Sequence, residues 1–180
     1  MEKKERTRIK ISGRQFWAFL LAAWLLFIFG HSMVPAQISS EESGTLLVLL
    51  LELADGLGID AGWLTEHILR KMAHFTEYGV YGVLLWINSK NGWRERRYSR
   101  AGWQEKVFPL ALAVIGVPFL DETIQLFTPG RSGRVEDVWL DMAGCLAGLL
   151  STKLFMELLG KLLCRKNGRQ GRGMHGRQIR

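Results

Sequence analysis

Ionisable side chains lie inside otherwise apolar stretches of this chain, where a charge is costly to keep. His74 and Glu77 fall near the start of one such stretch, and Asp121 and Glu122 end another. Ionisable groups within a membrane-spanning segment usually face a cavity or each other. A histidine beside acidic groups can act as a general base, because its charge changes near neutral pH. We therefore take His74, Glu77, Asp121 and Glu122 as the candidate catalytic residues.

A second set of polar residues has the chemistry to bind a ligand beside these four. The set combines cations, acids and neutral hydrogen-bonding groups: Lys71, Tyr78, Gln125, Arg131, Asp137 and Asp141. At the helical period, Lys71, His74 and Tyr78 share one face. Arg131 can form paired hydrogen bonds with a phosphate or a carboxylate. This second set is our prediction for the substrate-binding residues.

Long apolar runs must position these side chains. The runs contain at most one charged residue each and comprise residues 15–40, 72–89, 107–120 and 138–152. A spanning helix needs about 20 residues, so the third run must continue through Asp121 to about residue 127 to cross a bilayer. The pattern predicts an all-α polytopic membrane helical bundle of four transmembrane helices. Their predicted bounds are 16–35, 71–88, 107–127 and 137–163.

The loop between the first two predicted spans contains one more apolar stretch. Residues 45–57 are strongly apolar but too short to cross the hydrocarbon core. We expect a short interfacial helix here, lying in the outer interface or packed across the mouth of the bundle. A lid over the polar residues is the functional alternative.

The distribution of lysine and arginine predicts the orientation. Basic residues concentrate in 1–14, 88–106 and 161–180, whereas residues 34–69 contain acids but no lysine or arginine. Cytoplasmic segments are the ones enriched in lysine and arginine, so both termini should be cytoplasmic in a multi-pass protein of the plasma membrane. The candidate polar residues then share one depth near the outer boundary. A cleaved signal peptide remains an alternative for the first span.

The same pattern divides the chain into a membrane domain and two basic ends. We expect a basic cytoplasmic N-terminus over 1–15, a membrane domain over 16–163 and a disordered basic cytoplasmic tail over 164–180. The formal charge of +7 is therefore a topology signal, and we expect no nucleic-acid partner. Acids and histidine are potential metal ligands, but no HExxH-like pattern is present, so we predict no metal and no cofactor.

Three sequence runs carry a resemblance to a known family. The runs are HFTEYG at 74–79, DETIQLFTPGRSG at 121–133 and DVWLDMAG at 137–144. Together they resemble the VanZ-like family, and the resemblance covers most of residues 16–160. Residues 31–36, together with Ser39, Ser40 and Ser43, also resemble the family's first loop, which argues against signal cleavage. The position of Asp141 is often Asn in that family.

The resemblance implies a protein of the bacterial cell envelope, because the founding member is linked to low-level resistance to the lipid-tailed glycopeptide teicoplanin. Our first hypothesis is a non-enzymatic membrane protein that binds a lipid-linked cell-wall component or a lipoglycopeptide at the outer leaflet. The alternative is a membrane-embedded enzyme that modifies a lipid head group with His74 as the general base. Transport by four helices would require a homo-oligomer, which the sequence leaves open.

Overall fold

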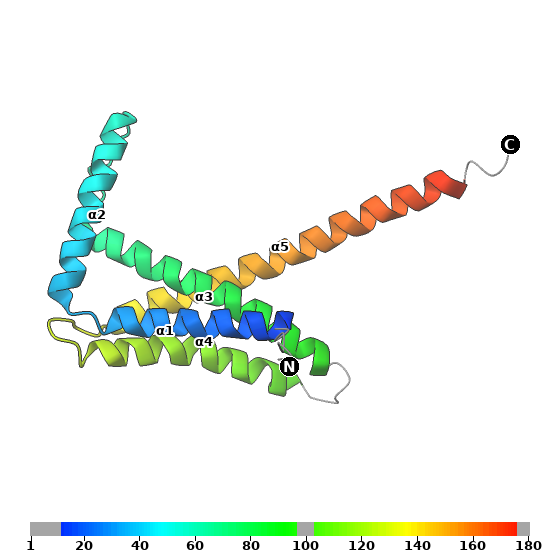
Figure 1. Cartoon of the computed structure of the whole chain (residues 1–180), viewed down its shortest axis with the longest axis horizontal. Helices are drawn as coiled ribbons and strands as arrows, with labels where there is room; N and C mark the ends of the chain where they lie inside the picture. The colour runs from blue at the N-terminus through cyan, green and yellow to red at the C-terminus, as the bar shows by residue number, and fades with distance from the viewer. Residues whose placement is uncertain (1–11, 97–102, 176–180) are drawn as a thin grey trace, which may run out of the picture.

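The computed structural model describes the backbone of residues 12–96 and 103–175, and the side chains of residues 12–90 and 107–163. This part of the chain forms five α-helices and no strand, which confirms the all-α prediction (Figure 1). The helices are α1 (Gly13–Ser32), α2 (Ala36–Gly56), α3 (Glu66–Arg96), α4 (Trp103–Gln125) and α5 (Val135–His175). The predicted basic N-terminus, except for residues 12–15, lies outside the described residues.

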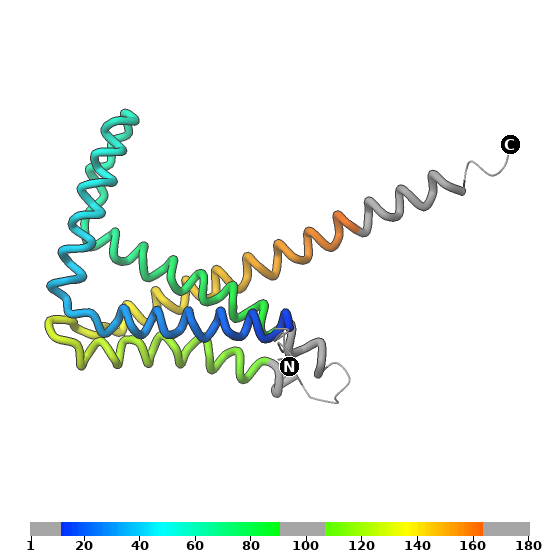
Figure 2. The backbone as a smooth tube through the Cα atoms, viewed as in Figure 1, coloured from blue at the N-terminus to red at the C-terminus, as the bar shows by residue number. Residues whose placement is uncertain are grey.

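Four of the helices form a bundle, from which one helix and the end of another project. Helices α1 and α4 run side by side, and α3 crosses the first part of α5 (Figure 1). The backbone trace shows α2 leaving one end of the bundle at a steep angle, while the later part of α5 leaves the bundle in another direction (Figure 2). The α2 end of the bundle therefore brings together the end of α1, the end of α4 and the start of α5.

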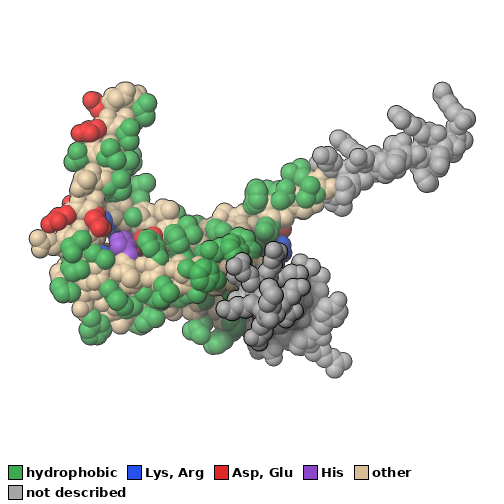
Figure 3. Space-filling model, in the orientation of Figure 1, with side chains coloured by type: hydrophobic (Ala, Val, Ile, Leu, Met, Phe, Trp, Pro, Cys, Tyr) green, Lys and Arg blue, Asp and Glu red, His purple; other side chains and the backbone are tan. Residues whose placement is uncertain are grey.

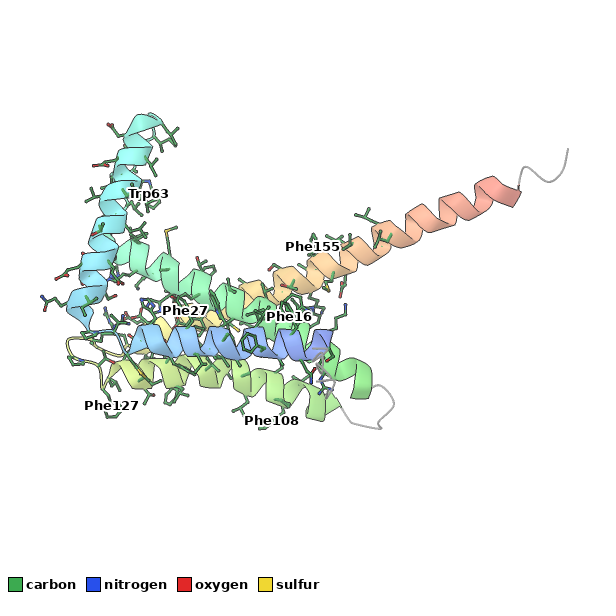
Figure 4. The ribbon with its side chains drawn as sticks, in the orientation of Figure 1. Phe16, Phe27, Trp63, Phe108, Phe127 and Phe155 are labelled. Atoms are coloured by element: carbon green, nitrogen blue, oxygen red, sulfur yellow. The ribbon has the colours of Figure 1, made fainter. Side chains whose placement is uncertain are left out.

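Within the part of the chain that the structure describes, three helical segments are long and apolar enough to cross a membrane, namely Gly13–Ser32, Val107–Gln125 and Val135–Leu163. The predicted second span lies in α3, which is not among them. Aromatic side chains such as Phe108 and Phe155 point outward from these helices and are 68% and 65% exposed (Figure 4). Such an apolar exterior suits lipid better than water. These helices identify a membrane protein.

Local sequence signals explain where the helices begin and turn. Ser12 caps α1 by accepting a hydrogen bond from the backbone of Gln15, whose side chain accepts one from Ser12 in return. Pro35 is the N-cap residue of α2 and directly precedes the first turn of that helix. In the turn between α4 and α5, Gly130 has a φ of 74°, a conformation that favours glycine. This turn is tied to α2 by the hydrogen bond from Ala36 N to Pro129 O.

Glycines allow α3 and α5 to pack with their backbones almost in contact. A Cβ atom at Gly148 would overlap the backbone carbonyl of Gly79, and one at Gly82 would overlap that of Cys145. A Cβ at Gly144 would lie 2.5 Å from the backbone oxygen of Phe75. Small residues on this face of α5 allow close helix packing, and the structure places their partners on α3.

An apolar core fills the centre of the bundle beneath its α2 end. It contains residues from α1, α3, α4 and α5: Ile28, Tyr78, Tyr81, Leu85, Val114, Cys145 and Leu149. Trp24 packs against this core and donates its indole N–H to the backbone oxygen of Glu77 at 3.0 Å. That bond satisfies a polar group in the middle of an uncharged span, where no water is present to do so.

Two segments differ from the sequence prediction in their length. Helix α2 begins at Ala36 and not near residue 45, and its polar first half is tied to α3 and to the turn before α5 by Ser43 Oγ to Glu66 Oε1 at 3.2 Å and by Ala36 N to Pro129 O at 3.1 Å. Helix α5 continues to His175, inside the segment 164–180 for which the sequence predicts disorder. The side chains after residue 163 lie outside the described part of the chain.

Candidate functional site

Polar side chains from four helices meet at the α2 end of the bundle. Asp121, Glu122 and Gln125 belong to the last turns of α4, and each is buried. Asp141, in the second turn of α5, is 0% exposed. His74 and Glu77 approach from α3, and Ser32 from the end of α1. The predicted convergence of residues distant in the sequence is therefore present in the geometry.

Asp121 is held by neutral hydrogen-bond donors. Its Oδ1 accepts a bond from the hydroxyl of Ser32, and its Oδ2 accepts one from Gln125 Nε2 at 3.3 Å. Thr128 donates in turn to the backbone oxygen of Ser32 at 2.9 Å. These bonds fix the carboxyl group in orientation, while the charge of Asp121 has no lysine or arginine ion-pair partner among the described residues.

Glu122 connects α4 to the loop before α5. Its Oε1 accepts a hydrogen bond from Gln125 Nε2 at 3.1 Å, and its Oε2 accepts one from the backbone N–H of Arg134 at 2.8 Å. Both oxygens are thus used to hold the turn. This arrangement favours a structural role for Glu122, although the sequence predicts it as a catalytic candidate.

Glu77 pairs with a histidine that the sequence prediction did not include. His31 Nδ1 lies 3.1 Å from Glu77 Oε1, and both side chains are partly buried. A carboxylate that accepts from Nδ1 fixes the ring orientation and the tautomer of the imidazole. His31 is the first polar residue after the apolar stretch 16–30, and the resemblance of residues 31–36 to the family's first loop is the other sequence signal that pointed to it.

His74 lies beside the most deeply buried acid of the bundle. Its Nδ1 is 3.8 Å from Asp141 Oδ1, which is beyond hydrogen-bonding distance. Neither that nitrogen nor either oxygen of Asp141 has a hydrogen-bond partner. With Asp121, these residues offer one imidazole nitrogen and two carboxylate oxygens within 4.8 Å of one another. This trio is the group in the described chain that has the donor atoms to hold a metal ion.

A cavity of about 350 Å³ opens above this cluster, between α2, the start of α3 and the turn before α5. Figure 3 shows a histidine side chain in the hollow where α2 meets the bundle, with acidic side chains nearby. His31, His74 and Gln125 line the cavity from the bundle side. Ser39 and Ser43 line it from α2. The cavity therefore has polar walls that several elements supply.

Cations gather on the walls of the cavity. Lys71 Nζ is 3.9 Å from Asp137 Oδ1, and Arg70 Nη2 is 3.8 Å from Glu66 Oε1. Arg131 is half-buried, donates from Nε to the backbone oxygen of Val34 at 2.9 Å, and forms no ion pair with a described carboxylate. Burial lowers the pKa of Arg131 from its usual value, but a guanidinium remains a cation at neutral pH.

The structure separates the predicted residues into two layers. Lys71, His74, Gln125, Arg131 and Asp137 line the cavity. The others lie below it or beside it, within the bundle: Glu77, Tyr78, Asp121, Glu122 and Asp141. Residues of the lower layer can orient the side chains at the cavity floor or contribute charge to it. A ligand in the cavity contacts the residues of the upper layer first.

Several residues of the cavity were not among the candidates from the sequence. Besides His31, the wall includes Arg70, Ser39 and Ser43. Ser39 is buried, and Arg70 Nη1 lies 3.5 Å from Ser40 Oγ, so contacts between α2 and α3 position this side of the cavity. Ser39, Ser40 and Ser43 carry a resemblance to the family's first loop, but the contacts of Ser40 and Ser43 with α3 depend on where the first half of α2 lies.

Comparison with known proteins places this arrangement in a family. The family model VanZ/LLP1 matches residues 16–156, which include all five helices at least in part. The chain belongs to the VanZ/LLP1 family. The resemblance seen in the three sequence runs is thereby confirmed, and each of those runs contributes to the polar end of this VanZ/LLP1 protein. No curated protein and no solved structure matches the chain.

Proposed function

We propose that this protein of the bacterial cell envelope binds the anionic head group of a lipid-linked cell-wall component or of a lipoglycopeptide antibiotic such as teicoplanin. The observation that carries the proposal is the half-buried guanidinium of Arg131 in the wall of a polar cavity. Its Nε is held by a backbone carbonyl, so the rest of the fork can face a phosphate or a carboxylate. A contribution to glycopeptide resistance would follow if the bound ligand were the antibiotic.

The orientation of the chain supports an outward-facing cavity. Lysine and arginine are abundant in residues 1–14 and 88–106 and absent from residues 34–69, which contain α2. With both termini in the cytoplasm, α3 is needed as an additional span, and its ionisable side chains Lys71, His74 and Glu77 are partly buried. The cavity then opens at the outer leaflet, where lipid-linked precursors and glycopeptides are present.

The shape of the site supports a ligand with a polar head and an apolar tail. A volume of about 350 Å³ lies at the lower end of the range for small-molecule sites, so it suits a head group. Leu46 of α2 lines the cavity, and exposed apolar side chains such as Leu49 and Leu53 continue along α2 beyond it. A lipid tail can follow this apolar surface into the membrane while the head group stays in the cavity.

Replacing Arg131 with glutamine should weaken the binding of an anionic head group by about 10- to 100-fold, because a hydrogen bond to a charged group is worth about 1.5–3 kcal/mol. We would measure equilibrium binding of a polyprenyl phosphate and of teicoplanin to the purified chain in nanodiscs. The control variant is Lys153→Gln, which removes an exposed cation of α5 outside the cavity. Equal affinities for the two variants would refute the Arg131 site.

The His31–Glu77 pair favours a second candidate function, a membrane-embedded enzyme acting on the same head group. A carboxylate-oriented imidazole in a cavity wall is the arrangement of a general base. The base would then be His31 and not the His74 expected from the sequence. Profiling of membrane lipids distinguishes the two functions. If the protein is an enzyme, cells with the unchanged chain contain a modified lipid that cells with the His31→Gln variant lack. If it only binds the lipid, the two lipid profiles are the same.

A further inference from the structure

We propose that His74, Asp121 and Asp141 form a binding site for a divalent transition-metal ion of the Zn²⁺ type at the floor of the cavity. The three side chains come from α3, α4 and α5, and one donor atom from each lies within 4.8 Å of the other two. Three consecutive helices therefore supply a compact set of donors.

Unpartnered buried atoms point to a ligand at this place. Asp141 is 0% exposed, and neither of its carboxylate oxygens has a hydrogen-bond partner. His74 Nδ1 is buried and also lacks a partner. Buried polar atoms of native proteins are almost always satisfied, and a buried charge is usually paired or bound to a metal. A cation between these atoms would satisfy all of them together.

The charges of the surroundings support a divalent ion. Asp121 and Asp141 bring two carboxylates, and no ion pair between either of them and a lysine or an arginine is seen among the described residues. Two cations of the cavity wall are paired with other acids, Lys71 with Asp137 at 3.9 Å and Arg70 with Glu66 at 3.8 Å. One ion of charge +2 would balance the two acids without any further residue.

The donor types select the class of metal. An imidazole nitrogen favours Zn²⁺, Mn²⁺ and related transition metals, whereas Mg²⁺ and Ca²⁺ in proteins are bound mainly by oxygen. Cys145 is buried one turn beyond Asp141 but is not part of the trio, so the site offers no thiolate. The spacing of the donors is wider than a bound metal needs, and changes of side-chain torsion would bring them to about 2 Å from the ion.

Hydrogen bonds from neighbouring side chains support the proposed metal ligands. Ser32 and Gln125 each donate a hydrogen bond to Asp121, which orients that carboxylate. Three protein ligands leave a coordination position free, as in zinc sites that bind water or substrate. His74 and Gln125 line the cavity, so that free position faces the space where a head group would bind. The metal site stands independently of anion binding, since it rests on a different set of residues.

The test is metal binding by the purified full-length chain in nanodiscs. After treatment with a chelator and its removal, Zn²⁺ is added and the bound ion is measured by calorimetry and by elemental analysis. We expect about one ion per chain, and a loss of affinity of at least tenfold in His74→Gln and in Asp141→Asn. Co²⁺ should also give a visible absorption spectrum that both variants lose.

Two control variants make the result decisive. His67→Gln changes a histidine of the cavity wall that is outside the trio, and Glu157→Gln changes an exposed carboxylate of α5 outside the cavity. Both should bind Zn²⁺ as the unchanged chain does. The proposal is overturned if the unchanged chain binds no Zn²⁺, or if the control variants lose as much affinity as His74→Gln. Retained anion binding in the trio variants would show that the head-group proposal stands without the metal.

Discussion

Replacing Gly148 with alanine should destabilise the folded chain by at least about 2 kcal/mol. The added Cβ would overlap the backbone carbonyl of Gly79, and backbone atoms cannot move aside as a flexible side chain can. Overpacking of a tight interior typically costs about 1–3 kcal/mol. Helices α3 and α5 would have to separate, so His74 and Asp141 would also move apart. Unfolding in a mixed-micelle denaturant titration measures this change.

Gly160 is the matched control for Gly148. It lies on the same helix, and a Cβ at this position would meet nothing within 4 Å. Gly160→Ala should be neutral or should stabilise the chain by up to about 1 kcal/mol, because alanine is the better helix former. Equal destabilisation by the two substitutions would show that the loss at Gly148 has no connection with the close approach to α3.

Replacing Asp141 with asparagine should raise the stability of the metal-free chain. The carboxyl group of Asp141 is 0% exposed, and its oxygens have no hydrogen-bond partner. Burying a polar or charged group without compensation costs about 1–3 kcal/mol or more, and asparagine has the same shape without the charge. Thermal unfolding in the presence of a chelator should therefore occur at a higher temperature in Asp141→Asn than in the unchanged chain.

Added Zn²⁺ should reverse that order. A ligand at 100 times its dissociation constant stabilises a folded protein by about 2.7 kcal/mol, and only the unchanged chain keeps the full trio. The control is Asp137→Asn, whose carboxylate is half-buried and 3.9 Å from Lys71 Nζ. It should change stability by less than about 1 kcal/mol, with or without Zn²⁺. A metal-free unchanged chain that is more stable than Asp141→Asn would contradict our description of this carboxyl group as uncompensated.

Much of the fold follows from hydrophobic patterning. The uncharged run around α1 and the turn signals Pro129 and Gly130 place helix ends within a few residues. The convergence of His74, Asp121 and Asp141 also follows from the order of the helices, because antiparallel helices bring alternate ends together. These features depend on local periodicity and connectivity, which a sequence displays directly.

Other features depend on tertiary contacts that no local pattern displays. The first half of α2 is rich in serine and glutamate and reads as a loop, yet contacts to α3 and to Pro129 accompany a helix from Ala36. The packing role of Gly79 and Gly82 depends on the close approach of α5 to α3. The pairing of His31 with Glu77 likewise requires the position of α1 relative to α3. Side-chain roles at the site were therefore harder to predict than the helices.

The measurement that tests the account most directly is the labelling of a cysteine in the cavity wall from outside intact cells. Ser132 is exposed and lines the cavity, so Ser132→Cys in a chain with Cys145→Ala and Cys164→Ala is the reporter. A membrane-impermeant maleimide should label it without permeabilisation, and teicoplanin or a polyprenyl phosphate should slow the labelling. Lys90→Cys, at the opposite end of the bundle, should be labelled only after permeabilisation. Labelling of position 132 from the inside only, or at a rate that neither ligand changes, would contradict an outward-facing anion site.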